Sequence, residues 1–141
     1  MGEEKLYESL DFLINLINTT KENWIRETAA WSLKELNSFK ARKPLIEQLK
    51  MHPECAESLV YALEIFDCRD ILEFLVDMFI AEPKAALLRI NIRDCIKNQD
   101  LENIPESVRS SCLLNLDLAI QKTCDNEDLE QLEDLYEIFT I

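Results

Sequence analysis

The chain has 141 residues, of which 48% are apolar, so it is long enough to form one continuous core, and we expect a single domain over residues 1–141. It contains one glycine, which argues against strand-rich folds with tight turns, phosphate-binding loops and dinucleotide fingerprints, because these need glycine backbones. The net charge of −13 predicts repulsion from nucleic acids and from anionic membrane surfaces, and attraction to basic partners.

The acidic residues are concentrated toward the C-terminal end of the chain. Residues 1–50 contain eight acidic and eight basic residues, whereas residues 101–141 contain ten acidic and two basic residues. Two interpretations stay open: the excess charge serves solubility, or it forms a docking field for a basic protein. A calcium loop is disfavoured for residues 125–137, because their acids follow helical spacing instead of alternating around a glycine.

The first residues, Met-Gly-Glu-Glu-Lys, include no apolar run, and no apolar run elsewhere reaches the length of a membrane span. We therefore expect a cytoplasmic protein whose thiols are reduced and form no intramolecular disulfide. Five cysteines occur without paired spacing, which makes a structural zinc site improbable and predicts small core positions for most of them. They are Cys55, Cys68, Cys95, Cys112 and Cys124.

Apolar residues recur at helical spacing along nearly the whole chain, and no segment alternates like a strand. Pro44 is expected in the first turn of a helix, while Pro53, Pro83 and Pro105 are expected at helix starts, where a missing N–H is harmless. Residues 98–104 are too few for a full helix and predict a turn or a short helical stub. The predicted helices span residues 5–18, 22–37, 41–51, 53–66, 69–80, 83–97, 105–122 and 127–139.

The pattern of the helix at 22–37 recurs along the chain. Its apolar stripe contains Ile25, Ala29, Leu33 and Leu36. Aligning Ile25 with Cys55, Lys84 and Val108 brings similar residues into register, most weakly in the copy that starts at Lys84. These anchors are about 30, 29 and 24 residues apart, a period typical of stacked helical repeats.

Residues 25–33, which begin Ile-Arg and end Ser-Leu, and residues 43–49, Lys-Pro-Leu-Ile-Glu-Gln-Leu, resemble the short-unit subtype of the HEAT-repeat family. The chain departs from the family pattern at Ala56, where arginine is usual, and at Lys34 and Glu64, where glycine is common. The resemblance implies an all-α fold: an α-α superhelix, or HEAT-like solenoid, of about four antiparallel helix pairs, led by the 5–18 helix as a half-unit. It also implies a binding scaffold that is not an enzyme and has no cofactor.

His52 is the only histidine, which argues against metal sites built from several histidines. Its spacing of three from Cys55 would allow a Cys–His pair, but a nucleophile also needs an orienting group and an oxyanion hole. A turn histidine beside a core cysteine is therefore the favoured interpretation.

The second helices of such repeat pairs line the concave side of the stack. In this chain they would carry seven acids and one aromatic residue, which we predict to bind a partner. These residues are Glu47, Asp70, Glu73, Phe74, Asp77, Glu130, Asp134 and Glu137. Phe74 is either an interface anchor ringed by acids or a core residue that fills a gap. Trp31 and Tyr61 hold equivalent positions and are expected to pack between adjacent repeats, in preference to forming a ligand site.

Two classes of function follow. The favoured hypothesis is an inhibitor that neutralises a basic, nuclease-type toxin through its acidic surface, because the profile of the chain is similar to that of small acidic immunity proteins, including those of bacterial contact-dependent growth inhibition. The alternative is a HEAT-like adaptor or assembly scaffold in a larger protein complex.

Overall fold

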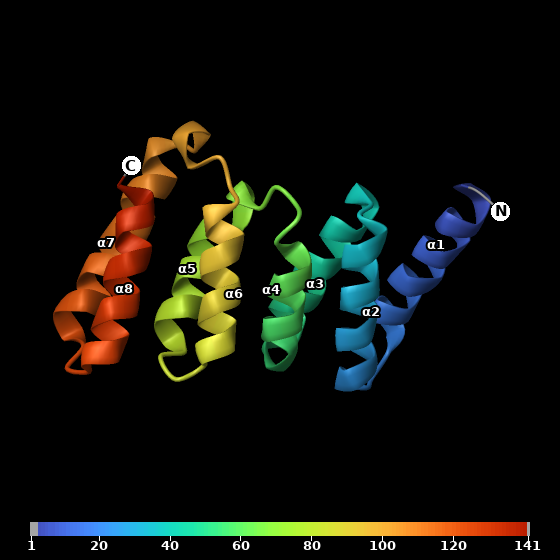
Figure 1. The fold of residues 1–141 in the computed structure, drawn as a ribbon, viewed down its shortest axis with the longest axis horizontal. Coiled ribbons are helices and arrows are strands. Elements are labelled where there is room, and N and C mark those ends of the chain that lie inside the picture. The colour runs from blue at the N-terminus through green and yellow to red at the C-terminus, as the bar shows by residue number, and fades with distance from the viewer. Residues whose placement is uncertain (1–2, 141) are drawn as a thin grey trace. The chain divides into compact units, whose positions relative to one another are not determined.

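The computed structural model describes the backbone of residues 3–140 and the side chains of residues 8–140. Within this range the protein is all-α, with eight α-helices, four short 3-10 segments and no strand (Figure 1), which confirms that the fold is all-α. The α-helices are α1 (Glu3–Thr19), α2 (Asn23–Leu36), α3 (Arg42–Met51), α4 (Ala56–Leu63), α5 (Leu72–Ala81), α6 (Ala86–Lys97), α7 (Glu106–Lys122) and α8 (Asn126–Phe139). The 3-10 segments are η1 (Phe39–Ala41), η2 (Pro53–Cys55), η3 (Arg69–Ile71) and η4 (Leu101–Asn103).

The helix boundaries lie close to the predicted ones, with two informative exceptions. Pro44 lies in the first turn of α3 as expected. Pro83, however, lies in the turn before α6, which begins only at Ala86. The helix predicted at 53–66 is divided into η2 and α4, and α4 ends at Leu63 because the chain turns there, with the N–H of Phe66 donating to the Leu63 carbonyl.

Side chains and backbone at the helix ends explain where several helices stop and start. Asn37 ends α2 in the left-handed conformation, with φ of 50°, and its N–H donates to the carbonyls of Leu33 and Lys34. Asparagine tolerates this conformation, so it can replace the glycine that commonly ends helices. At the start of α8 the Asp125 carboxylate accepts a hydrogen bond from the N–H of Asp128, as its sequence position predicts.

The chain divides into two compact units, Met1–Phe66 and Asp67–Ile141. The prediction of a single domain over the whole chain stays a prediction. In the first unit α1 pairs with α2 and α3 pairs with α4, while α2 and α4 pack side by side. Leu33 of α2 and Leu63 of α4 are both fully buried, as their equivalent places in the repeat predict.

In the second unit α5 pairs with α6 and α7 pairs with α8. The helices α5 and α7 pack side by side, and α6 and α8 lie on the other side of the unit (Figure 1). Arg89 of α6 joins these two helices by a hydrogen bond to Gln131 and an ion pair with Asp128 of α8. This arrangement corrects the expected order of the helices. The alignment at Val108 treats α7 as a first helix and α8 as a second helix, but α7 lies beside the second helix α5.

The register of the third repeat also needs correction. Lys84 lies in the turn before α6, whereas Ile25 and Val108 are the third residues of α2 and α7. The third residue of α6 is Leu88, and it is followed by Arg89, as Ile25 is followed by Arg26. The recurring element is therefore an apolar residue followed by arginine at the third and fourth positions of a helix.

The three arginines of this element, Arg26, Arg89 and Arg109, share one structural role. Each donates a hydrogen bond to a backbone carbonyl at or next to the C-terminal end of another helix, namely Thr20 after α1, Phe79 in α5 and Phe139 in α8. The last carbonyls of a helix have no partner within it and carry partial negative charge, so a guanidinium stabilises them. The arginine thus ties one helix of the fold to the end of another.

Candidate protein-binding surfaces

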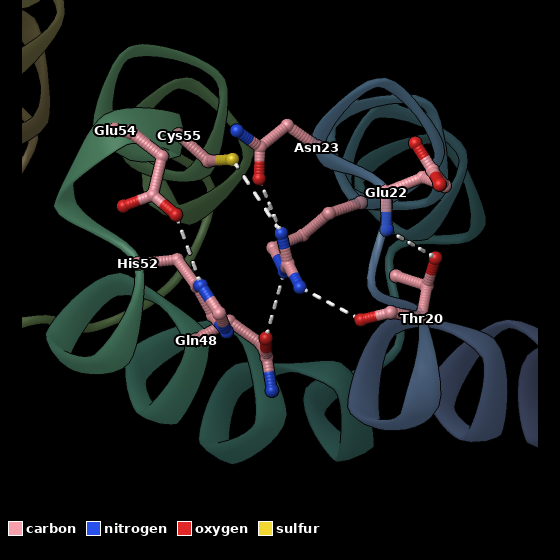
Figure 2. Close-up of polar contacts among 8 residues, drawn as sticks. Thr20, Glu22, Asn23, Gln48, His52, Glu54 and Cys55 are labelled. Carbon is pink, nitrogen blue, oxygen red and sulfur yellow. Dashed lines mark hydrogen bonds and ion pairs between the residues drawn. The ribbon is translucent and has the colours of Figure 1, made fainter.

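The buried guanidinium of Arg26 organises the first unit (Figure 2). Its Nε donates to Gln48 Oε1 at 3.0 Å, Nη1 donates to Asn23 Oδ1 at 2.8 Å, and Nη2 donates to the Thr20 carbonyl at 2.8 Å. All three acceptors are neutral, so hydrogen bonds satisfy the buried cation where no carboxylate does. This network fixes the start of α2 against α3 and against the end of α1.

His52 and Cys55 each contact another side chain in place of the Cys–His pair that the sequence allows (Figure 2). His52 Nδ1 lies 3.1 Å from Glu54 Oε1, and Nη1 of Arg26 lies 3.8 Å from Cys55 Sγ. Cys55 is buried, and burial raises the pKa of its thiol, so the thiol is protonated near neutral pH. The favoured interpretation, a turn histidine beside a core cysteine, matches this geometry.

The predicted acids of α5 lie on a surface that α5 shares with α7. Glu73 and Asp77 are exposed, one turn apart, and Phe74 between them is half-buried. Asn115 Nδ2 of α7 donates to Asp77 Oδ1 at 3.5 Å. Among the described side chains no base forms an ion pair with either carboxylate, so both charges face solvent without compensation.

Two leucines of α7 complete this surface. Leu114 is 58% exposed and Leu118 is 43% exposed, and they lie one turn apart beside Asn115. We call the set Glu73, Phe74, Asp77, Leu114 and Leu118 the α5–α7 surface. The leucines were missed in the sequence, because apolar residues also recur on the buried side of α7 and the pattern does not distinguish the two faces.

The pKa of the buried Cys112 thiol on α7 depends in part on the two carboxylates of α5. Burial and, to a smaller extent, the negative charges of Glu73 and Asp77 together raise the pKa of Cys112 to about 12. The hydrogen bond from Asn115 to Asp77 places at least the Asp77 carboxylate next to α7.

The other predicted residues do not all join the α5–α7 surface. Asp70 is exposed in η3, directly before α5. Glu130, Asp134 and Glu137 are exposed on α8, which lies on the side of α6, so they are not beside the acids of α5. Glu47 is exposed on α3 and belongs to the first unit. The expectation that all seven acids line one side rested on treating α8 as a second helix.

A second surface, made of aromatic residues, covers the outer side of α2 and α4. Trp24 is 66% exposed, Trp31 is 56% exposed and Tyr61 is 41% exposed. The rings of Trp31 and Tyr61 meet edge to face, with centroids 6.1 Å apart and an interplanar angle of 60°. We call these three residues the α2–α4 aromatic cluster. The expected contact between Trp31 and Tyr61 is confirmed, but their rings also face solvent.

Lys34 is held on this cluster. Its Nζ lies 3.3 Å from the centroid of the Tyr61 ring and 3.5 Å from Glu64 Oε2. The seven-residue spacing of Trp24 and Trp31 was the available signal for the cluster, because it places both indoles on the side of α2 opposite the buried Ala29, Ala30 and Leu33.

Residues 8–140 contain no group of three or more side chains that could hold a metal ion. None of the described helices combines the length and the apolar character that crossing a membrane requires.

Comparison of the chain with protein-family models, with curated proteins and with solved structures finds no match.

Proposed function

We propose that this is a non-enzymatic protein-binding protein that engages a basic partner protein through the α5–α7 surface. The observation that carries the proposal is that α5 and α7 pack side by side, with Leu114 and Leu118 exposed on α7 and the carboxylates of Glu73 and Asp77 exposed on α5 without an ion-pair partner among the described side chains. Exposed apolar side chains gathered beside charge are typical of protein interfaces, where the apolar part supplies affinity and the charge supplies specificity and speed.

The net charge of −13 favours a partner with positive charge. A negative surface repels nucleic acids and anionic lipids and accelerates encounter with a basic protein. We propose a basic nuclease-type toxin as that partner and an immunity or inhibitor role for this chain in the cytoplasm, as in contact-dependent growth inhibition. A nuclease carries positive charge to bind phosphates, so an acidic protein can occupy its active site.

We further propose that the helices stack as a HEAT-like superhelix of about four antiparallel pairs. Two features favour it: side-by-side packing of alternate helices occurs within each unit, and Arg26, Arg89 and Arg109 recur at the same position of their helices. A HEAT-like adaptor is the second candidate function. It is favoured by a separate apolar surface on each unit, since an adaptor holds more than one partner.

Affinity capture tests the proposal. The full chain is immobilised, and the bound proteins are identified by mass spectrometry at about 0.1 M and at about 0.5 M salt, where screening of exposed charges differs strongly. We expect a basic protein that is retained at low salt and lost with the Glu73→Lys/Asp77→Lys variant. Asp11→Lys, at an exposed site on α1, is the control for a change of net charge. Equal capture by the wild type and the double variant would contradict the proposal.

The captured protein also decides between the two candidate functions. If it is a nuclease, one equivalent of this chain should abolish its activity, as an inhibitor requires. If its activity is unchanged and further proteins are captured with it, the adaptor role is favoured.

A further inference from the structure

We infer that the α2–α4 aromatic cluster binds arginine side chains of a basic protein segment. The inference rests on the proposed function for the sign of the partner, and it assigns a second contact surface, on the first unit, with its own chemistry. The relevant residues are Trp24, Trp31 and Tyr61, whose exposed rings lie on two helices that pack side by side.

The exposed rings offer π-faces to a cation. An indole is the strongest aromatic acceptor of a cation, and a guanidinium also stacks flat on it. Trp24 and Trp31 lie seven residues apart on α2, which places them about 10.5 Å apart along the helix axis. A basic segment crossing this surface therefore meets two indoles in succession.

The chain already places a cation of its own on the cluster. Lys34 Nζ lies 3.3 Å from the centre of the Tyr61 ring, and Glu64 Oε2 lies 3.5 Å from the same ammonium. One aromatic ring and one carboxylate thus form a working cation site within the protein. The two indoles repeat the aromatic half of this arrangement, and neither indole is paired with a cation among the described residues.

Carboxylates supply the second component of such a cation site. Four glutamates lie one helical turn from a ring of the cluster, at spacings of three or four residues that put them on the same side of the helix. These are Glu27, Glu35, Glu57 and Glu64. Lys34 is the only base of α2 or α4 on this side, since the guanidinium of Arg26 is buried in the interior of the unit. Lys34 is paired with Glu64, so Glu27 and Glu35 give the indole-bearing side of α2 its negative charge.

This charge selects the occupant. A second copy of this chain, with its own net charge of −13, would meet this negative charge, and so would a nucleic acid or an anionic lipid surface. A purely apolar segment would leave the glutamates beside the cluster without a positive partner. Arginine satisfies both parts of the surface, because its planar head stacks on an indole while its N–H groups donate to a carboxylate.

The test uses the full chain and follows its indole N–H signals by NMR. Trp24 and Trp31 are the only tryptophans, so the two indole resonances report on the cluster alone. The probe is a short peptide of arginine and serine, and the control peptide carries citrulline in place of arginine, which keeps the planar shape but removes the charge. We expect the arginine peptide to shift both indole signals and the citrulline peptide to leave them unchanged.

Variants locate the site. Trp31→Leu should lower the affinity for the arginine peptide by about threefold to tenfold, as loss of a cation–π contact predicts. Phe12→Leu, which removes an exposed ring on α1, is the matched control and should have no effect. Three results would overturn the inference: unmoved indole signals, equal shifts with citrulline, or indole shifts that depend on protein concentration without peptide, which would indicate self-association.

The peptide experiment can fail independently of the proposed function. If the arginine peptide leaves the indole signals unmoved but Glu73→Lys/Asp77→Lys still prevents capture of a basic protein, only the aromatic site is refuted. If the indoles bind arginine while Glu73→Lys/Asp77→Lys leaves capture unchanged, only the α5–α7 surface is refuted.

Discussion

The Nε of Arg26 donates a hydrogen bond to Gln48 Oε1 at 3.0 Å, and both side chains are buried. The bond links α2 to α3 in the first unit, and the same guanidinium reaches the Thr20 carbonyl after α1. A single residue therefore connects three consecutive helices, which makes it a direct test of how the unit is held together.

Replacing Arg26 with methionine should destabilise the protein by about 2–4 kcal/mol, because it leaves the Gln48 side chain and the Thr20 carbonyl without their donor. In urea denaturation, Gln48→Leu combined with Arg26→Met should cost less than the sum of the two single variants, since the pair shares one interaction. Lys21→Met, at an exposed site, is the control. Strict additivity would show that the bond contributes nothing.

Leu33→Asp and Leu63→Asp should each destabilise the protein by several kcal/mol, because each places an unpaired charge at a fully buried position. Leu114→Asp is the matched control, since this leucine is exposed on α7 and its change should stay within about 0.5 kcal/mol. Thermal melts followed by circular dichroism measure all three. Wild-type melting of either buried variant would show that the helices pack differently.

The cysteines should divide into one reactive thiol and four protected ones. Cys124 is exposed, whereas Cys55, Cys68, Cys95 and Cys112 are buried. Brief alkylation of the native protein should modify Cys124 alone, and alkylation after denaturation should modify all five, as mass spectrometry would record. Rapid native labelling of Cys112 would contradict its burial.

Stability should fall at high pH, partly because of Cys112. Burial and the charges of Glu73 and Asp77 raise the pKa of this thiol from its ordinary value of 9.0 to about 12. The raised pKa means that the folded state favours the protonated thiol, so this contribution is complete below pH 9 and is lost as the pH rises toward 12. Cys112→Ser should flatten this part of the profile of unfolding free energy against pH, and an unchanged slope would exclude the thiol as its cause.

Apolar residues of the α5–α7 surface should control how long a partner stays bound. Phe74→Ala and Leu114→Ala should each speed dissociation by about fivefold to tenfold with little change in association, because apolar anchors act after encounter. Surface plasmon resonance with the captured partner measures both rates. Leu87→Ala, at an exposed leucine of α6, is the control, and equal effects of all three variants would place the interface elsewhere.

The sequence predicted the helices well, because apolar spacing and prolines mark where each one runs and begins. It predicted the order of the helices less well. Val108-Arg109 matches Ile25-Arg26, and this match predicts that α7 and α2 are both first helices. The structure shows that the shared feature is the arginine, which donates to a carbonyl at or after the end of another helix, and this role does not fix which side of the unit its helix occupies.

The candidate surfaces were predicted only in part, for a similar reason. The exposure of Glu73, Asp77 and the α8 acids follows from charge, but their grouping depends on which helices lie side by side. The exposure of Trp31 and Tyr61 was missed, because equivalent positions in two repeats predict that residues meet and do not predict that one side of the contact is open to solvent.

We propose that the uncompensated carboxylates of the α5–α7 surface steer a basic protein toward this chain. The most direct test is the association rate of the captured partner at about 0.01 M and about 0.1 M ionic strength, where the screening length shrinks from roughly 30 Å to about 10 Å. We predict that the rate falls about tenfold or more for the wild type, and that Glu73→Lys/Asp77→Lys removes most of this dependence while Asp11→Lys does not. A rate that is insensitive to salt, or equal effects of these reversals, would contradict the account.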